Sequence, residues 1–242
     1  MPHLSVIVLL SLVSAGAAFV QRVSGFGFGI FAMLFLPYFL PSQAAASTVA
    51  SLISCVCNGY NAIRYRKSVR PRIMLPLVCA ALVTIPIAVR FSAVGPEHLL
   101  KRLLGVVLIL LSLYFLFFSK RIHIRPTIPN GLLAGALGGT LNGLFSTGGP
   151  PAVLYLMHAT EDNLTYFATI QAYFALTNIY SSTMRALNGL ITREILLLSV
   201  LGLAGWWIGD RVGTKVFARL NPERLRRVIY IGMIASGILM LV

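Results

Sequence analysis

The sequence has few charged residues, and very few of those are acidic. Of its 242 residues 11% are charged, with six Asp or Glu against twenty Lys or Arg, whereas 57% are hydrophobic. Soluble domains have about 25% charged and about 45–50% apolar residues, so an ordinary soluble domain is excluded. A bilayer core of about 30 Å takes about 20 apolar residues per helix. The composition therefore predicts an all-α polytopic membrane protein with about eight to ten membrane segments.

Catalytic and metal-binding motifs are absent as well. The three cysteines, Cys55, Cys57 and Cys79, lie in apolar stretches without metal-ligand spacing, which indicates small buried apolar residues. No nucleotide-binding loop or Ser/His/Asp constellation occurs, and no carboxylate lies in the middle of an apolar run. We therefore expect no catalytic residue, no metal and no cofactor, and we predict that the protein is not an enzyme.

The basic excess gives a formal net charge of +14, which in a soluble chain would suggest nucleic acid. Here the basic residues cluster at the ends of apolar runs, as in the segment 64–72. Lys and Arg in such positions orient helices in a membrane. We therefore expect the lipid bilayer, and no nucleic acid, as a partner.

Apolar runs separated by charges, Pro or Gly lie at 3–20, 29–40, 43–63, 73–90, 99–118, 127–142, 150–158, 163–187, 193–210 and 225–242. Three short matches recur in order: Ser24-Gly25-Phe26 with Asn142-Gly143-Leu144, Asn58-Gly59-Tyr60 with Asn178-Ile179-Tyr180, and Pro96-Glu97-His98-Leu99 with Pro222-Glu223-Arg224-Leu225. Their offsets are 118, 120 and 126 residues. The matches predict two homologous halves, 1–122 and 123–242.

Two apolar stretches contain glycine-rich breaks, at 24–29 and 146–151. As one helix, 3–40 would be about 57 Å long, nearly twice the bilayer core. The arms that follow the breaks, 29–40 and 150–158, are too short to cross alone. Each stretch is therefore predicted to be a broken helix or helical hairpin with its turn at membrane depth, where irregular backbone must be buried or line a cavity.

The charge distribution bears on whether the halves are parallel or inverted. If each hairpin returns to its starting side, each half has five segments and the halves are inverted. Fourteen basic residues, in 64–72, 119–125 and 211–227, are then cytoplasmic and five are outside, with Arg22 not counted. In the parallel arrangement, ten basic residues are cytoplasmic and nine are outside. The positive-inside rule favours inverted repeats, an arrangement that recurs in secondary transporters.

The glycine-rich turns are the candidate binding site. Backbone N–H groups at a helix start, together with the helix dipole, can hold an anion. The alternative, that the glycines only allow close helix packing, is preferred for Gly135, Gly138 and Gly139. The predicted substrate-binding residues are Ser24, Gly25, Gly27, Gly29, Ser146, Thr147, Gly148 and Gly149, with Gln21, Arg22, Asn58, Asn142, Gln171 and Asn178 as second choices.

The sequence leaves the roles of two arginines open. Arg22 lies two residues before the first turn in apolar sequence, so it either pairs with an anionic substrate or extends to lipid headgroups. Arg185 lies toward the end of its predicted helix, and we expect a topology or interface residue there.

Most of the chain resembles the TauE/SafE family of sulfite and organosulfonate exporters. The resemblance rests on Gln21, Ser24-Gly25-Phe26-Gly27-Phe28-Gly29 and Pro37, on Gly143-Leu144-Phe145-Ser146-Thr147-Gly148-Gly149-Pro150-Pro151, on Gln171-Ala172-Tyr173-Phe174 through Thr177-Asn178, and on Asn188-Gly189-Leu190-Ile191-Thr192. It implies transport of small sulfur-containing anions across a bacterial inner membrane. This chain departs from the family in having Phe26 and Phe28 between the first glycines, which leaves the size and polarity of the substrate open.

The predicted function is therefore a secondary transporter of a small sulfur-containing anion such as sulfite or sulfoacetate. Alternating access is expected around a midplane site between the two turns. The alternatives are an anion channel and a non-transporting membrane assembly factor. The sequence is also compatible with a homo-oligomer.

Overall fold

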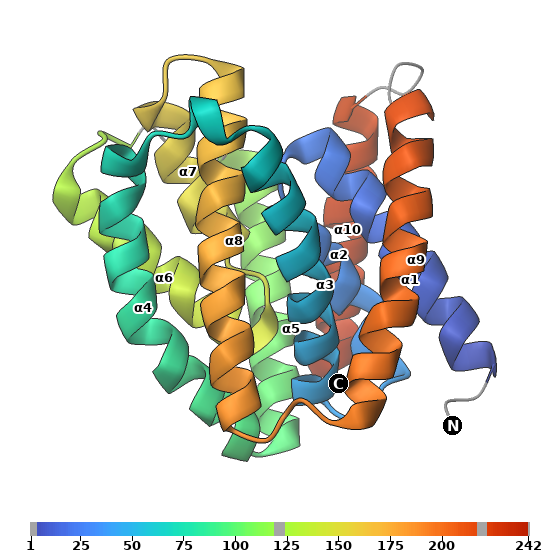
Figure 1. The fold of residues 1–242 in the computed structure, drawn as a ribbon. Coiled ribbons are helices and arrows are strands. Elements are labelled where there is room, and N and C mark those ends of the chain that lie inside the picture. Colours follow the sequence, from blue (N-terminus) through green and yellow to red (C-terminus); the bar gives the residue numbers. More distant parts are fainter. Residues whose placement is uncertain (1–3, 119–123, 217–221, 242) are drawn as a thin grey trace.

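The computed structural model describes residues 4–118, 124–216 and 222–241, and these form a bundle of α-helices without strands (Figure 1). The α-helices are α1 (Leu4–Ser24), α2 (Phe28–Phe35), α3 (Gln43–Arg64), α4 (Pro71–Val94), α5 (Glu97–Leu113), α6 (Ile128–Phe145), α7 (Gly149–Ala159), α8 (Asn163–Leu187), α9 (Arg193–Val216) and α10 (Pro222–Leu241). Short helical turns are η1 (Leu36–Tyr38), η2 (Arg66–Ser68) and η3 (Tyr114–Phe118). Every predicted apolar run corresponds to one α-helix, so the all-α prediction is confirmed.

Helix starts follow ordinary capping chemistry. Ser42 precedes α3, and its side chain accepts a hydrogen bond from the Ala45 amide at 3.0 Å. Asp162 precedes α8 and accepts from the amides of Leu164 and Thr165, both at 2.9 Å. Hydrogen bonds from Thr165 and Leu164 lower the pKa of the Asp162 carboxyl. These caps satisfy amides that have no partner inside a helix.

Both glycine-rich stretches are helical hairpins, as predicted. A Cβ atom added to Gly16 would lie 2.7 Å from Cε1 of Phe31, so α2 folds back along α1. In the second half, a Cβ atom on Gly131 would lie 3.1 Å from Cζ of Tyr155, so α7 folds back along α6. Each short arm thus packs on the longer arm that precedes it.

Two pairs of helices that hold equivalent places in the predicted halves, α3 with α8 and α5 with α10, are antiparallel. The start of α3 meets the end of α8, where Arg185 Nη1 donates to Ser47 Oγ at 2.9 Å. Beyond the end of α3, the Arg70 amide donates to Thr169 Oγ1 near the start of α8. Figure 1 shows the same relation, with α3 rising to the upper α3–α4 connection and α8 descending to the lower α8–α9 connection.

The hairpin helices α1 and α6 each pack on a parallel helix of the opposite half. Glycines make this contact close: a Cβ atom on Gly135 of α6 would lie 2.6 Å from Cα of Leu77 in α4. On α9, a Cβ atom on Gly205 would lie 2.8 Å from Cα of Ser11 in α1. The packing role expected for Gly135 is confirmed, because its missing side chain allows the two backbones to touch.

Buried apolar side chains form two core clusters instead of one. One joins the first hairpin to α3, α5 and α10, and the other joins the second hairpin to α4 and α8. Phe26, in the first turn, contacts both clusters. The space between the clusters is where the two hairpin turns meet.

The outer surface is apolar, as expected of a multi-pass membrane protein. Among the described residues four helical segments are long and apolar enough to cross a bilayer: Ser5–Arg22, Pro71–Val94, Glu97–Phe117 and Arg193–Val212. Side chains such as Val83 and Ile87 are about two-thirds exposed. Cys79 is exposed too, so its prediction as a buried residue was wrong, whereas Cys57 is buried.

Gly135→Ala is expected to lower the free energy of unfolding by about 1–3 kcal/mol, because the added methyl group would overlap the Leu77 backbone. Gly59→Ala is the matched control, since no atom lies within 4 Å of its added Cβ atom, and alanine stabilises a helix by about 0.5–1 kcal/mol over glycine. Thermal unfolding in detergent measures both. Equal melting temperatures for the two variants would contradict the close α4–α6 contact.

Candidate functional site: a cavity between the hairpin turns

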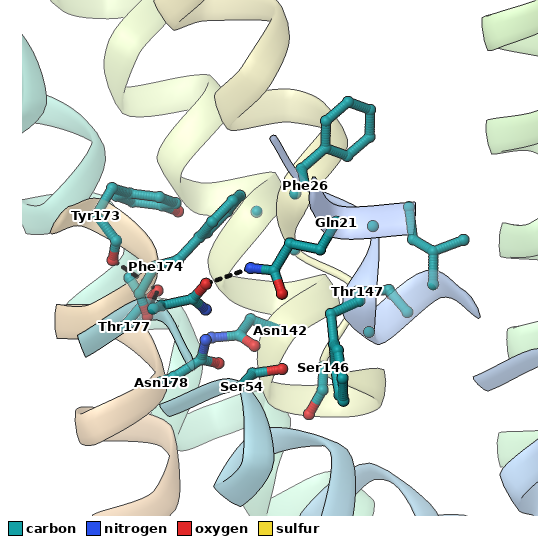
Figure 2. Close-up of a pocket in the computed structure, with 18 residues that line it drawn as sticks. Gln21, Phe26, Ser54, Asn142, Ser146, Thr147, Tyr173, Phe174, Thr177 and Asn178 are labelled. Atoms are coloured by element: carbon teal, nitrogen blue, oxygen red, sulfur yellow. Dashed lines mark hydrogen bonds between the residues drawn. The ribbon is translucent and has the colours of Figure 1, made fainter. Parts of the chain in front are cut away.

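A small cavity lies between the two hairpin turns and the facing sides of α3 and α8 (Figure 2). The structure brings ten predicted site residues to its wall: Gln21, Gly27, Gly29, Asn58, Asn142, Ser146, Thr147, Gly148, Gly149 and Asn178. Residues more than 100 positions apart in the chain thus share one site, where the sequence analysis expected it.

The first turn requires glycine because of its backbone conformation. Gly25 has φ 78° and Gly27 has φ 105°, both in the left-handed region that side chains disfavour. Gly27 is the N-cap of α2, and its carbonyl accepts from the Phe31 amide at 2.9 Å. The amides of Phe28, Gly29 and Ile30 therefore precede the first donor of α2 and have no acceptor within the helix. All three residues line the cavity.

The second turn requires glycine because space is short. Its left-handed residue is Ser146, at φ 56°, and the Ser146 hydroxyl donates to the Ser47 carbonyl at 2.7 Å. Gly148 has an ordinary φ of −68°, but a Cβ atom there would lie 2.8 Å from Cβ of Asn142. The left-handed positions Gly25 and Ser146 are 121 residues apart. The sequence match of Ser24-Gly25-Phe26 with Asn142-Gly143-Leu144 has an offset of 118 residues. It therefore aligned the first turn with the last helical turn of α6 and not with the second turn.

The two turns touch directly. A Cβ atom on Gly29 would overlap the Ser146 carbonyl group, lying 2.9 Å from its carbon. By contrast, a Cβ atom on Gly149 would lie 3.4 Å from Phe26 Cδ2 and 3.5 Å from Phe174 Cζ, which is ordinary contact. Gly29 thus determines how closely the hairpins approach.

The described wall of the cavity is polar but contains no Lys, Arg, Asp or Glu side chain. Its polar groups are amides and hydroxyls, and Figure 2 shows Asn142, Asn178 and Ser54 turned toward the same space. Gln21 Nε2 donates to Asn58 Oδ1. The buried Thr147 Oγ1 has no hydrogen-bond partner within the described structure. Free amides of α2 and an unpartnered hydroxyl form a donor set suited to a small anion.

Helix α8 supports both turns from behind. Gln171 Nε2 donates to the Gly25 carbonyl at 2.8 Å, just past the end of α1. Arg185 Nη2 donates to the carbonyls of Asn142 and Gly143, at 3.3 and 2.8 Å, in the last turn of α6. Gly25 and Gln171 therefore position the first turn without lining the cavity. The interface role expected of Arg185 was wrong, because its side chain is fully buried.

Two other predicted residues are not brought to the cavity wall. Arg22 Nε lies 4.0 Å from Asp210 Oδ1 on α9, and both side chains are partly exposed. The guanidinium thus pairs with a carboxylate, which neither of the two roles considered for Arg22 had included. Ser24 ends α1, but its side chain lies outside the described part of the structure.

Several wall residues were not predicted from the sequence. Ser54 lies one helical turn before Asn58 on α3, and this i, i+4 spacing could have revealed it. Gly138, assigned to packing alone, lines the cavity and also packs beneath Gly148. Phe26, Tyr173 and Phe174 form the aromatic part of the wall.

Comparison with known proteins confirms the family that the sequence resembles. Residues 10–240 match the family model described as sulfite exporter TauE/SafE. The chain belongs to the TauE/SafE family. A curated TauE/SafE relative, the "Probable sulfite/organosulfonate exporter TauE" of Cupriavidus necator, is 22% identical over 235 residues, covering 95% of this chain and 91% of the relative. No solved structure matches the chain significantly. TauE/SafE proteins are transporters by the family's description, which agrees with the prediction that this protein is not an enzyme.

Gly29→Ala should destabilise the protein by about 1–3 kcal/mol, because its methyl group would force the two turns apart. Gly149→Ala serves as the control in the neighbouring turn, where the new methyl group fits at van der Waals distance. Melting temperatures in detergent compare them. The contact between the turns would be refuted if Gly29→Ala melted no lower than Gly149→Ala.

Proposed function

We propose that this protein is a secondary transporter that moves a small sulfur-containing anion, such as sulfite or an organosulfonate, across the bacterial inner membrane. The observation that supports this most is the cavity between the two turns. Its wall includes Phe28, Gly29 and Ile30, whose amides have no acceptor within α2, and Thr147, whose hydroxyl has no partner in the described structure. The described wall contains no acidic side chain. An anion supplies the acceptors that these donors lack.

The arrangement of the halves supports alternating access by two inverted copies. Helices α3 and α8, and also α5 and α10, are antiparallel, which is the relation that a two-fold axis in the membrane plane produces. The hairpins α1–α2 and α6–α7 each fold back, so each half has five segments. Asn58 and Asn178 occupy corresponding positions and both line the cavity. Movement of one half against the other would open the cavity to each side in turn.

The preference for sulfur rests on the family and on the named relative. The wall itself is suited to an oxyanion with several oxygens, because donors converge from both hairpins. The residues at the start of α2 line the cavity from the first hairpin, Asn142 and Thr147 line it from the second, and Asn178 adds an amide side chain from α8. A sulfite or sulfonate head has three oxygens to accept these hydrogen bonds.

Thr147→Val should weaken sulfite binding about ten- to hundredfold, since a hydrogen bond to a charged group contributes about 1.5–3 kcal/mol. The stability of the empty protein should not fall, because the hydroxyl has no partner there. Thr183→Val is the matched control: Thr183 is exposed on α8, and its hydroxyl donates to the Ile179 carbonyl. Titration calorimetry gives the affinity and thermal unfolding gives the stability. Unchanged affinity in Thr147→Val would remove this hydroxyl from the site.

The purified protein in liposomes should take up labelled sulfite or methanesulfonate with saturation, and unlabelled anion inside should accelerate the uptake by counterflow. Flux that neither saturates nor shows counterflow would indicate a channel. A protein that binds and moves none of these anions would indicate an assembly factor. Gly149→Val, which adds methyl groups between Phe26 and Phe174, should remove the flux and leave the protein in the membrane.

A further inference from the structure

We propose that Arg185 provides the positive charge that compensates the transported anion, and that the cavity therefore accepts a singly charged anion in preference to a doubly charged one. This inference rests on the proposed function of the same cavity. It concerns the charge of the substrate, which neither the family nor the named relative specifies. Arg185 acts as a positioning residue, because the guanidinium lies behind the wall of the cavity.

The Arg185 side chain is fully buried between α3, α6 and α8. Nη1 donates to Ser47 Oγ at 2.9 Å and to Thr48 Oγ1 at 3.2 Å. Nη2 donates to the Asn142 and Gly143 carbonyls, and Nε has no partner within the described structure. Its four acceptors are neutral oxygens, which a neutral donor could also satisfy, and an ionisable group inside a membrane protein is a functional candidate by default.

The charge of this guanidinium is not neutralised by a carboxylate in the described part of the chain. All four of its acceptors are hydroxyl or carbonyl oxygens. The two ion pairs in the described part of the chain do not involve Arg185: one joins Arg22 to Asp210 and the other joins Lys101 to Glu97. A buried charge without a counterion is costly, so an anion in the cavity would lower the free energy of the protein.

The helix dipoles at the two turns do not compensate the charge of Arg185. Each hairpin turn joins the C-terminal end of one helix, with about half a negative charge, to the N-terminal end of the next, with about half a positive charge. The two ends at each turn therefore nearly cancel. Among the described residues that line the cavity or bind its wall, the formal charge that remains is the positive charge of Arg185.

Arg185 is close enough for its charge to act on the cavity. Asn142 lines the cavity with its side chain and accepts from Arg185 with its carbonyl at 3.3 Å. Ser47 accepts from Arg185 and, through its carbonyl, from the wall residue Ser146. One residue thus separates the guanidinium from the cavity. Coulomb interactions are strong at such range when water is largely excluded.

One positive charge fully compensates a monoanion. A dianion of the same shape would leave one negative charge buried and unpaired, which raises the cost of its transfer from water. The substrates that fit best are therefore monoanions, such as hydrogen sulfite or a monosulfonate. Sulfate and disulfonates are disfavoured by charge alone.

The wild-type protein tests this preference with ligands of similar shape. Calorimetry should show that methanesulfonate, a monoanion, binds at least tenfold more tightly than sulfate, a dianion. Dimethyl sulfone, which is neutral, should bind weakly in every variant. Sulfate affinity equal to or above that of methanesulfonate would overturn the inference and leave the proposed anion transport intact. Absence of binding by every anion would instead refute the proposed function.

Variants then test the role of Arg185 itself. Arg185→Gln should weaken methanesulfonate binding at least tenfold, equivalent to about 1.4 kcal/mol, and should leave dimethyl sulfone binding unchanged. Arg185→Lys keeps the charge and should retain the preference for methanesulfonate over sulfate. Arg193→Gln, which removes the same charge from an exposed position at the start of α9, is the matched control and should bind as the wild type does.

The outcomes separate charge from structure. Equal weakening of methanesulfonate and dimethyl sulfone in Arg185→Gln would show that Arg185 only holds the turn in place, and would overturn the inference. If Arg185→Gln does not fold, the inference is still tested by Arg185→Lys and by the comparison of methanesulfonate with sulfate in the wild-type protein. Loss of the monoanion preference in Arg185→Lys would also count against the inference.

Discussion

Two helices break inside an apolar protein, and the carbonyl groups freed at the breaks must find hydrogen-bond donors within the chain. Helix α8 supplies both donors: Gln171 binds the Gly25 carbonyl after α1, and Arg185 binds the last turn of α6. In the described structure, the amides at the start of α2, on the other side of the first break, have no such partner. Because these carbonyls have donors and those amides have no such partner, the cavity offers hydrogen-bond donors, which is the basis of the proposal that it binds an anion.

The two turns reach similar shapes by different means. Glycines at positions 25 and 27 adopt left-handed conformations in the first turn. The second turn has Ser146 in that conformation, held by its hydrogen bond to the Ser47 carbonyl, and uses Gly148 where a side chain would collide with Asn142. The first turn depends on the conformational freedom of glycine, and the second turn depends on its small size. Substitutions in them are therefore not equivalent.

The halves are also unequal in charge. Arg22 of the first hairpin is paired with Asp210, whereas Arg185, behind the second turn, binds only neutral oxygens in the described structure. An inverted repeat with identical halves would have a symmetric field. Among the described residues the unpaired charge lies behind one turn only, which would give the two ends of the proposed transport path different electrostatic properties.

Composition, run lengths and glycine-rich breaks were enough to predict the helices and both hairpins, because a bilayer restricts the chain to helices of limited length. The same features predicted ten of the wall residues, since turns and polar helix faces are local properties. Which side chain faces the cavity was decided only by packing. Asp210 on α9 takes Arg22 away from the site, and the end of α6 binds Arg185, because contacts between distant helices leave no periodic signal in the sequence.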